Sequence, residues 1–204
     1  MGKPYPLSTL DTVSIAPEAA AVSGYEARWE QHNSERRGQI VRAAIALLEE
    51  FVADGRARSI GVSNFTAAQL DRLASHSSTV PAVNQIEVHP YHANDDVRAY
   101  GQAHGIATEA WSPIAQGQVL DDPAVTAIAG EVDRTPAQVV LRWHIQRGDI
   151  VFPKSSSPQR MRENFALFDF DLTADWMAAI SALDRGVEGR RGPDPETFDW
   201  IPDR

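Results

Sequence analysis

The sequence predicts an α/β fold made of parallel βα units. Short runs rich in β-branched residues and bounded by turn residues alternate with segments that carry apolar residues at helical spacing. Most of these helical segments start at a residue that can cap a helix. Short strands that alternate with helices are typical of parallel βαβ units. Four such strands are expected, each followed by helical sequence.

The expected elements begin after residue 37. Residues 1–37 contain prolines, alanines and mixed charge without a sustained period, so we expect a loop or a frayed helix there. From Gln39 apolar residues recur at helical spacing until Asp54-Gly55 provides a stop. We therefore expect an irregular segment over residues 1–37 and the functional domain over residues 38–204.

Within that domain, strands are expected at 58–62, 83–88, 106–111 and 150–152. Two helices begin with a capping box, because Thr66 and Thr135 are each followed three residues later by a glutamine. The remaining helices are expected to start near Asn94, Asp122, Ser157 and Thr173. The tail from Gly186 is rich in glycine and proline and is expected to form a loop.

The loop after the last predicted strand is a candidate anion site. Lys154, Arg160 and Arg162 crowd the start of a helix, where the macrodipole and unpaired N–H groups already concentrate positive charge. A phosphate bound by Lys154, Arg160 and the hydroxyls of Ser155 and Ser156 would offset this repulsion. Local chemistry leaves an alternative, a solvated surface turn with ordinary basic residues.

Composition narrows the functional classes. The chain has 204 residues, 43% of them hydrophobic, and a formal charge of -9, so one domain is expected and a nucleic-acid partner is not. The absence of cysteine removes disulfides, thiolate nucleophiles and cysteine-ligated zinc. The start lacks the apolar segment of a signal peptide, and the longest apolar run, 43–48, is too short to span a bilayer. We expect a cytoplasmic protein without a membrane partner.

The sequence does not predict a metal site at His89, near a predicted strand end, or at His144, in a predicted helix. His89 and His144 have no carboxylate or histidine partner at metal-ligand spacing, so core or capping roles are expected for both. The sequence also contains no G-x-G-x-x-G motif and no P-loop.

Five collinear motifs resemble those of the aldo-keto reductase family. They are Gly61-Val62-Ser63-Asn64-Phe65, the run from Asn84 to Pro90, the run from Trp111 to Gly117, the run from Thr135 to Trp143, and Pro153-Lys154-Ser155 with Arg160 and Glu163-Asn164-Phe165. The resemblance covers roughly residues 39–204, which in that family is the second half of the molecule. It implies a (β/α)₈ TIM barrel of which this chain holds the C-terminal half, about four parallel strands with flanking helices. We therefore expect a truncated chain whose edge strands, 58–62 and 150–152, are open to self-association.

The same resemblance implies a site for NADP, in its reduced form NADPH. In the family the residues matching Ser63, Asn64 and Gln85 hydrogen-bond the nicotinamide carboxamide, and the aromatic residue matching Trp111 stacks on the ring. Taken singly, each has an ordinary alternative: a turn former at Asn64, a satisfied polar group at Gln85, core packing at Trp111. The other expected cofactor-binding residues are Ser112, Ile114, Gln116, Lys154, Ser155, Ser156, Arg160, Glu163 and Asn164.

The family transfers a hydride from NADPH to an aldehyde or ketone. Its catalytic tyrosine, lysine, aspartate and histidine come from the first half of the barrel, and none has a match in this sequence. We therefore assign no catalytic residue and expect impaired turnover by the chain alone. The alternative is a non-catalytic NADP-binding or redox-sensing interaction module.

Overall fold

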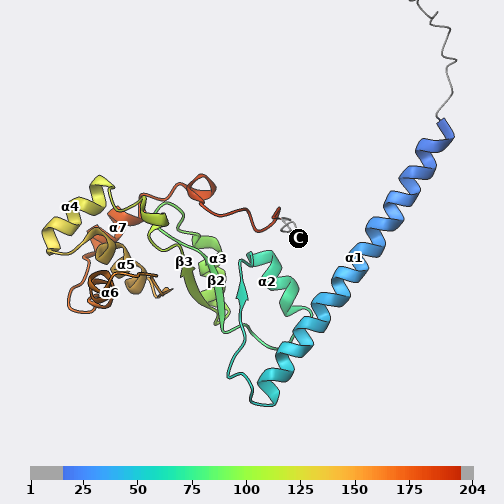
Figure 1. Ribbon diagram of the computed structural model, residues 1–204, viewed down its shortest axis with the longest axis horizontal. Coiled ribbons are helices and arrows are strands. Elements are labelled where there is room, and N and C mark those ends of the chain that lie inside the picture. The colour runs from blue at the N-terminus through green and yellow to red at the C-terminus, as the bar shows by residue number, and fades with distance from the viewer. Residues whose placement is uncertain (1–15, 199–204) are drawn as a thin grey trace, which may run out of the picture. The chain divides into compact units, whose positions relative to one another are not determined.

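The computed structural model describes residues 16–198. They fall into two units, one reaching to Leu47 and one starting at Leu48. The sheet and all the predicted site residues lie in the second unit (Figure 1). Within the described part of the chain, no helix is both long enough and apolar enough to cross a bilayer.

The first helix, α1 (Ala16–Ala53), is longer than its apolar pattern predicted. Of the loop or frayed helix expected up to residue 37, the loop is wrong from Ala16 onward, where the chain is helical, and residues 1–15 lie outside the described part. Alanine, glutamate, glutamine and arginine are strong helix formers, and Pro17 stands in the first turn, where its missing N–H costs nothing. The helix ends at the predicted stop, with Gly55 in the left-handed region at φ 78°.

The second unit holds a four-stranded parallel sheet, which confirms the α/β prediction. Its strands are β1 (Val62–Ser63), β2 (Val83–Glu87), β3 (Ala107–Trp111) and β4 (Ile150–Val151), in that order across the sheet. Residues 58–61 were expected to be part of the first strand but lie outside it, although the carbonyl of Ile60 accepts from the backbone nitrogen of Ala82 at 2.8 Å. An end strand has a neighbour on one side only, so β1 and β4 are shorter than the two central strands.

The helices that follow the strands are α2 (Ala67–Ala74), α3 (Asp95–Ala103), α4 (Pro123–Val132), α5 (Pro136–Gln146), α6 (Pro158–Phe165) and α7 (Ala174–Ser181). Two short 3₁₀ helices, η1 (Ala115–Gly117) and η2 (Gly186–Gly189), lie in the connections. Both predicted capping boxes are present, at Thr66 and at Thr135. Ser157 and Thr173 also cap their helices as predicted.

The capping role predicted for Asn94 is wrong. This residue is in the left-handed region at φ 50° and makes no side-chain cap bond. Its amide nitrogen instead donates to the carbonyl oxygen of Glu87 at 3.2 Å. Asn tolerates this backbone region better than most residues, so its side chain joins the end of β2 to the start of α3.

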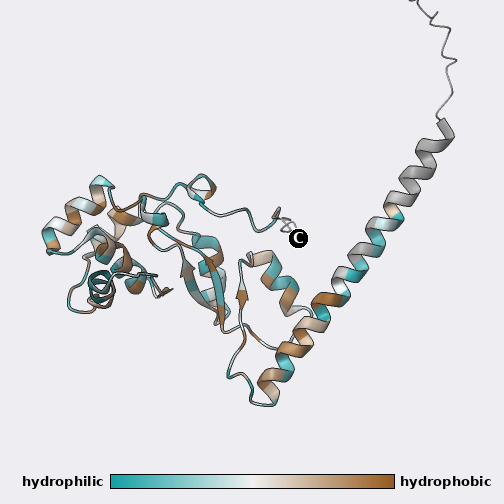
Figure 2. Ribbon diagram, in the orientation of Figure 1, coloured by the Kyte–Doolittle hydropathy of each residue, from teal (hydrophilic) through white to brown (hydrophobic). Residues whose placement is uncertain are grey.

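The main core lies among α4, α5 and α7, which cluster together in Figure 1. Val125, Val140 and Ile180 are fully buried there, and so is Ala115 of η1. A smaller cluster packs Ile86, Val88 and Ala110 of the sheet region against α3. By contrast, α6 is mostly hydrophilic and has no buried residue (Figure 2). The core thus reaches the loop that follows β3, and leaves α6 exposed to solvent.

Candidate cofactor site

One face of the sheet carries a row of polar and aromatic side chains. The register pairs Ser63 with Gln85, Gln85 with Glu109, and Glu87 with Trp111. Because residues in register in a parallel sheet point to the same face, these five side chains share one face. The opposite face is the one that packs on α3. The sheet therefore brings these site residues together on one face, as expected for residues at the ends of neighbouring parallel strands.

Hydrogen bonds join four of the predicted residues across three strands. The indole nitrogen of Trp111 donates to the side-chain oxygen of Asn64 at 2.8 Å. The backbone nitrogen of Asn64 and the hydroxyl of Ser63 both donate to the carbonyl oxygen of Gln85, at 2.8 and 3.1 Å. Asn64 has φ 60°, a left-handed conformation that turns the chain at the end of β1. This geometry brings Ser63, Asn64, Gln85 and Trp111 into one connected group.

Glu109 also belongs to this face, and the sequence analysis missed it. The amide nitrogen of Gln85 donates to the Glu109 carboxylate at 2.7 Å. This bond orients the amide and leaves its oxygen without a partner among residues 16–198. The signal was present in the sequence, because a residue two positions before Trp111 in a strand lies on the same face.

The loop after β3 carries three more predicted residues, Ser112, Ile114 and Gln116, and part of its backbone has an unusual conformation. Ser112 and Gln116 have φ 50° and 55°, and Ala115 between them has φ 48°. Holding a residue other than glycine in the left-handed region costs about 1–3 kcal/mol. Ile114 packs against the main core, in which Ala115 is fully buried. Such a loop persists only when the surrounding structure fixes it.

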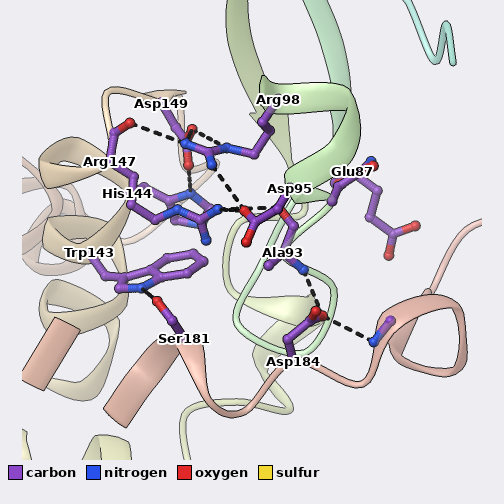
Figure 3. Close-up of polar contacts among 12 residues, drawn as sticks. Glu87, Ala93, Asp95, Arg98, Trp143, His144, Arg147, Asp149, Ser181 and Asp184 are labelled. Atoms are coloured by element: carbon purple, nitrogen blue, oxygen red, sulfur yellow. Dashed lines mark hydrogen bonds and ion pairs between the residues drawn. The ribbon is translucent and has the colours of Figure 1, made fainter. Parts of the chain in front are cut away.

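One such fixed point is the imidazole ring of His144 in α5. Its Nε2 lies 3.0 Å from the carbonyl oxygen of Pro113, and its Nδ1 lies 2.8 Å from a carboxylate oxygen of Asp149. The second carboxylate oxygen of Asp149 accepts from Arg98 of α3 at 2.7 Å. Figure 3 shows Arg98, His144 and Asp149 meeting together with Arg147, whose guanidinium stacks on Trp143 at 4.0 Å.

This histidine has an acceptor at each ring nitrogen. Burial lowers the pKa of His144, while the Asp149 carboxylate and the Pro113 carbonyl act in the opposite direction. Burial also opposes ionisation of Asp149, but His144 and Arg98 hold the pKa of its carboxyl below the ordinary value. The Pro113 carbonyl can only accept, so the contact at Nε2 is a hydrogen bond in the tautomer that carries the ring proton on that nitrogen. The expected core role of His144 is confirmed, since the residue is fully buried, and its carboxylate partner Asp149 was not expected from the sequence.

Glu87 anchors the tail on the site face. Its carboxylate accepts from the backbone nitrogens of Arg191 and Gly192, at 2.6 and 3.0 Å, and from His89 at 3.0 Å. Burial opposes its ionisation, but these hydrogen bonds lower the pKa of Glu87 below its ordinary value. A Cβ added to Gly192 would lie 2.4 Å from the Trp111 ring, so the tail touches the aromatic side chain. Neither the role of Glu87 nor its contact with His89 was predicted from the sequence.

The predicted anion loop follows β4. Lys154, Ser156 and Arg160 are exposed, and none of the basic residues Lys154, Arg160 and Arg162 forms an ion pair within the described chain. Ser157 accepts from the backbone nitrogen of Arg160 at 3.4 Å. Uncompensated cations at a helix N-terminus suit a phosphate ligand.

The other predicted residues of this loop are less clearly placed for a ligand. The hydroxyl of Ser155 accepts from the backbone nitrogen of Ser157, and the carboxylate of Glu163 accepts from Gln159. Asn164, beside Glu163, is partly buried. No hydrogen bond among residues 16–198 joins this loop to the group around Asn64 and Trp111. The structure thus places the predicted residues in two groups, one on the sheet face and one at the start of α6.

Parallel βα units with polar and aromatic residues at the strand ends are the arrangement of α/β enzymes that bind a ligand at that edge. A sequence model described as "Aldo/keto reductase family" matches residues 9–185. The chain belongs to the aldo/keto reductase family, as the five motifs indicated.

Similar proteins share this assignment. An aldo-keto reductase of Mycolicibacterium vanbaalenii is 54% identical over 71% of this chain and 51% of its own length. Methylglyoxal reductase DkgA of Yersinia pestis is 40% identical over 95% of this chain and 68% of its own length. A solved structure of a Gox0644 mutant in complex with NADPH has a TM-score of 0.73 and 47% identity, covering 75% of this chain and 56% of that one. The chain spans about half the length of the first of these relatives.

Proposed function

We propose that this chain binds NADP through residues 38–204 and serves an oxidoreductase that transfers a hydride from NADPH to an aldehyde or ketone. The observation that carries the proposal is the hydrogen bond between Trp111 and Asn64, next to Gln85. It places an aromatic ring beside two amide side chains on one face of the sheet. The NADPH complex of the similar structure supports the choice of cofactor. A cytoplasmic location belongs to the same proposal and rests on the absence of cysteine from the sequence.

Each group of residues has a role in this proposal. Ser63, Asn64 and the free amide oxygen of Gln85 hold the nicotinamide carboxamide, while Trp111 stacks on the ring. The loop residues Ser112, Ile114 and Gln116 line the path of the cofactor. Lys154 and Arg160 bind the 2′-phosphate, with Ser155 and Ser156 as hydroxyl donors and Glu163 and Asn164 beside them. Lys154 and Arg160 form no ion pair with any residue of 16–198, which supports their assignment to the phosphate.

The proposal for turnover is more restricted. No residue of this sequence matches the family's catalytic tyrosine, lysine, aspartate or histidine. An alkoxide formed by hydride transfer needs a proton or a stabilising donor, and general acid catalysis contributes about 10²–10⁴-fold. We therefore assign cofactor binding to this chain and expect slow carbonyl reduction from it alone. The same observation favours a second candidate function, a non-catalytic NADP-binding or redox-sensing module.

Two measurements on the full 204-residue chain test these functions. Titration with NADPH and NADH, followed by fluorescence or calorimetry, should show binding with a preference for NADPH. Assay of an aldehyde panel with NADPH should show little turnover. If neither cofactor binds, the proposal is overturned. Rapid turnover would reject both the non-catalytic module and the expectation of slow carbonyl reduction.

The architecture proposal is a half barrel that self-associates. β1 and β4 are the end strands of the sheet, so each has backbone groups on one side that no neighbouring strand pairs. In β4 and directly after it, the large apolar side chains of Ile150 and Phe152 are 44% and 51% exposed. A second copy that pairs with these edges would satisfy the backbone groups and cover the apolar surface.

A further inference from the structure

We propose that His144 is a positioning residue for the cofactor site, because its ring fixes the loop over residues 112–117 through the Pro113 carbonyl. By fixing this loop, it sets where Ser112 and Gln116 stand relative to the sheet and to Trp111 at the end of β3. The inference rests on the proposed function in that it takes this site to bind NADP. The mechanical part, that His144 holds the loop, does not depend on any ligand.

The loop is tied to the rest of the molecule at very few points. Its own backbone hydrogen bonds are internal: Ala115 donates to Ser112 at 2.8 Å, and Gly117 donates to Ile114 at 2.8 Å. Among residues 16–198, the contact from Nε2 of His144 to Pro113 is the one hydrogen bond that joins residues 112–117 to another element. The other anchor is apolar, since Ala115 is buried in the core. A loop that keeps three residues other than glycine at positive φ needs such fixed points.

His144 is itself held rigidly. It is fully buried in α5, and the turn after this helix, with Gly148 at φ 82°, brings Asp149 back under the ring. The backbone nitrogen of Asp149 donates to the carbonyl of His144 at 3.0 Å, and its carboxylate lies 2.8 Å from Nδ1. Arg98 binds the other carboxylate oxygen. Asp149 therefore fixes the ring orientation that points Nε2 at Pro113.

His144 and Asp149 also connect the site residues on the sheet face with those of the anion loop. Asp149 immediately precedes β4, and β4 leads into the loop with Lys154. Pro113 stands two residues after Trp111, at the end of β3. The path from Pro113 through His144 to Asp149 thus joins the loop after β3 to the strand before the anion loop. A change at His144 should act on the nicotinamide end, since Nε2 faces that loop.

Two substitutions separate the ring's two bonds. His144→Asn keeps a donor near the place of Nδ1 and loses the donor toward Pro113. His144→Gln keeps a donor near the place of Nε2 and loses the contact with Asp149. Both replace the buried imidazole by a smaller neutral amide. Asparagine is one methylene shorter than glutamine, so peptides covering α7, which packs against α5, control for its larger loss of packing. Circular dichroism checks that each variant folds.

The first readout is amide hydrogen exchange on the full chain without ligand. In His144→Asn, peptides covering residues 112–120 should exchange about tenfold faster or more, while peptides covering α2 keep the wild-type rate. His144→Gln should stay near wild type in the loop. Equal protection of the loop in all three proteins overturns the proposal, and so does equal loss of protection in the two variants.

The second readout is binding, measured with NADPH and with adenosine 2′,5′-bisphosphate, which lacks the nicotinamide. His144→Asn should bind NADPH about tenfold more weakly but keep its affinity for the bisphosphate. An equal loss for both ligands would show general damage and overturn the positioning role. If the wild type binds neither ligand, the proposed function fails, and hydrogen exchange still decides whether His144 holds the loop. Should His144→Asn not fold, the wild type decides: loop amides that exchange orders of magnitude faster than those around His144 refute the anchor.

Discussion

Replacing Glu87 by glutamine should loosen the tail from the site face. The carboxylate is buried, with 4% of the residue exposed, and it accepts two backbone N–H bonds and one from His89. A glutamine oxygen can accept from Arg191, but its NH₂ group would then face the N–H of Gly192. The variant loses at least one charge-assisted bond and leaves a donor unpaired, a cost of about 2 kcal/mol.

Limited trypsin digestion measures this change locally, because Arg190 and Arg191 are cleavage sites within the anchored segment. When opening is fast relative to cleavage, the rate follows the population of the open form, so about 2 kcal/mol predicts cleavage roughly 30-fold faster. Glu188→Gln is the matched control. That residue lies in the same tail and is exposed, and the same change of charge there should leave the rate unchanged.

Acid should remove the difference between the wild type and Glu87→Gln. The folded-state pKa of Glu87 is lowered from 4.5, so its contribution is fully present above that value and is lost as pH falls through the folded pKa. Glutamine does not titrate. The cleavage ratio should therefore be constant above about pH 5.5 and narrow below 4.5, as measured with an acid-tolerant protease that also cuts the tail. Equal cleavage of both variants at neutral pH, or a ratio that persists in acid, would refute the anchoring role.

Three further outcomes are expected. Arg160→Ala should reduce the preference for NADPH over NADH about tenfold, whereas Arg162→Ala, which removes the same charge from the same helix, should not; calorimetry of both cofactors decides. Thr135→Ala should lower the free energy of unfolding by about 1 kcal/mol through loss of the capping box, as urea denaturation would show, and an unchanged midpoint would contradict the cap. Size-exclusion chromatography with light scattering should find dimers or larger species because β1 and β4 are open edges, and a stable monomer would refute self-association.

The features predicted well from sequence are those with short-range causes. The capping boxes at Thr66 and Thr135 depend on residues three positions apart, and both formed. The central strands were placed within a residue or two because each has a neighbour on both sides. Strand 58–62 was misplaced because the length of an end strand depends on its single partner. Asn94 failed as a cap because its side chain found a distant carbonyl.

The candidate site was predicted in part for the same reason. Ser63, Gln85 and Trp111 followed from strand ends and motifs, and the register brought them together. Glu87 could not be assigned a partner, because the tail that it binds lies more than a hundred residues away. Asp149 is only five residues from His144, but the contact depends on the left-handed turn at Gly148. The residue spacing of helices and strands does not predict that turn, so the contact between His144 and Asp149 could not be predicted from it.

The order of the strands also has a consequence for how the molecule forms during synthesis. Strands lie across the sheet in the order in which they are made, so each new strand can pair with the one before it as it leaves the ribosome. The contact of Glu87 with Arg191 and Gly192 forms later, because these residues are 104 and 105 positions further along. Until they emerge, Glu87 has no backbone donor from the tail, and the edge of Trp111 that Gly192 contacts stays open. A nascent chain therefore exposes its site face for the time needed to add those residues, about 5–20 seconds at ordinary rates of synthesis.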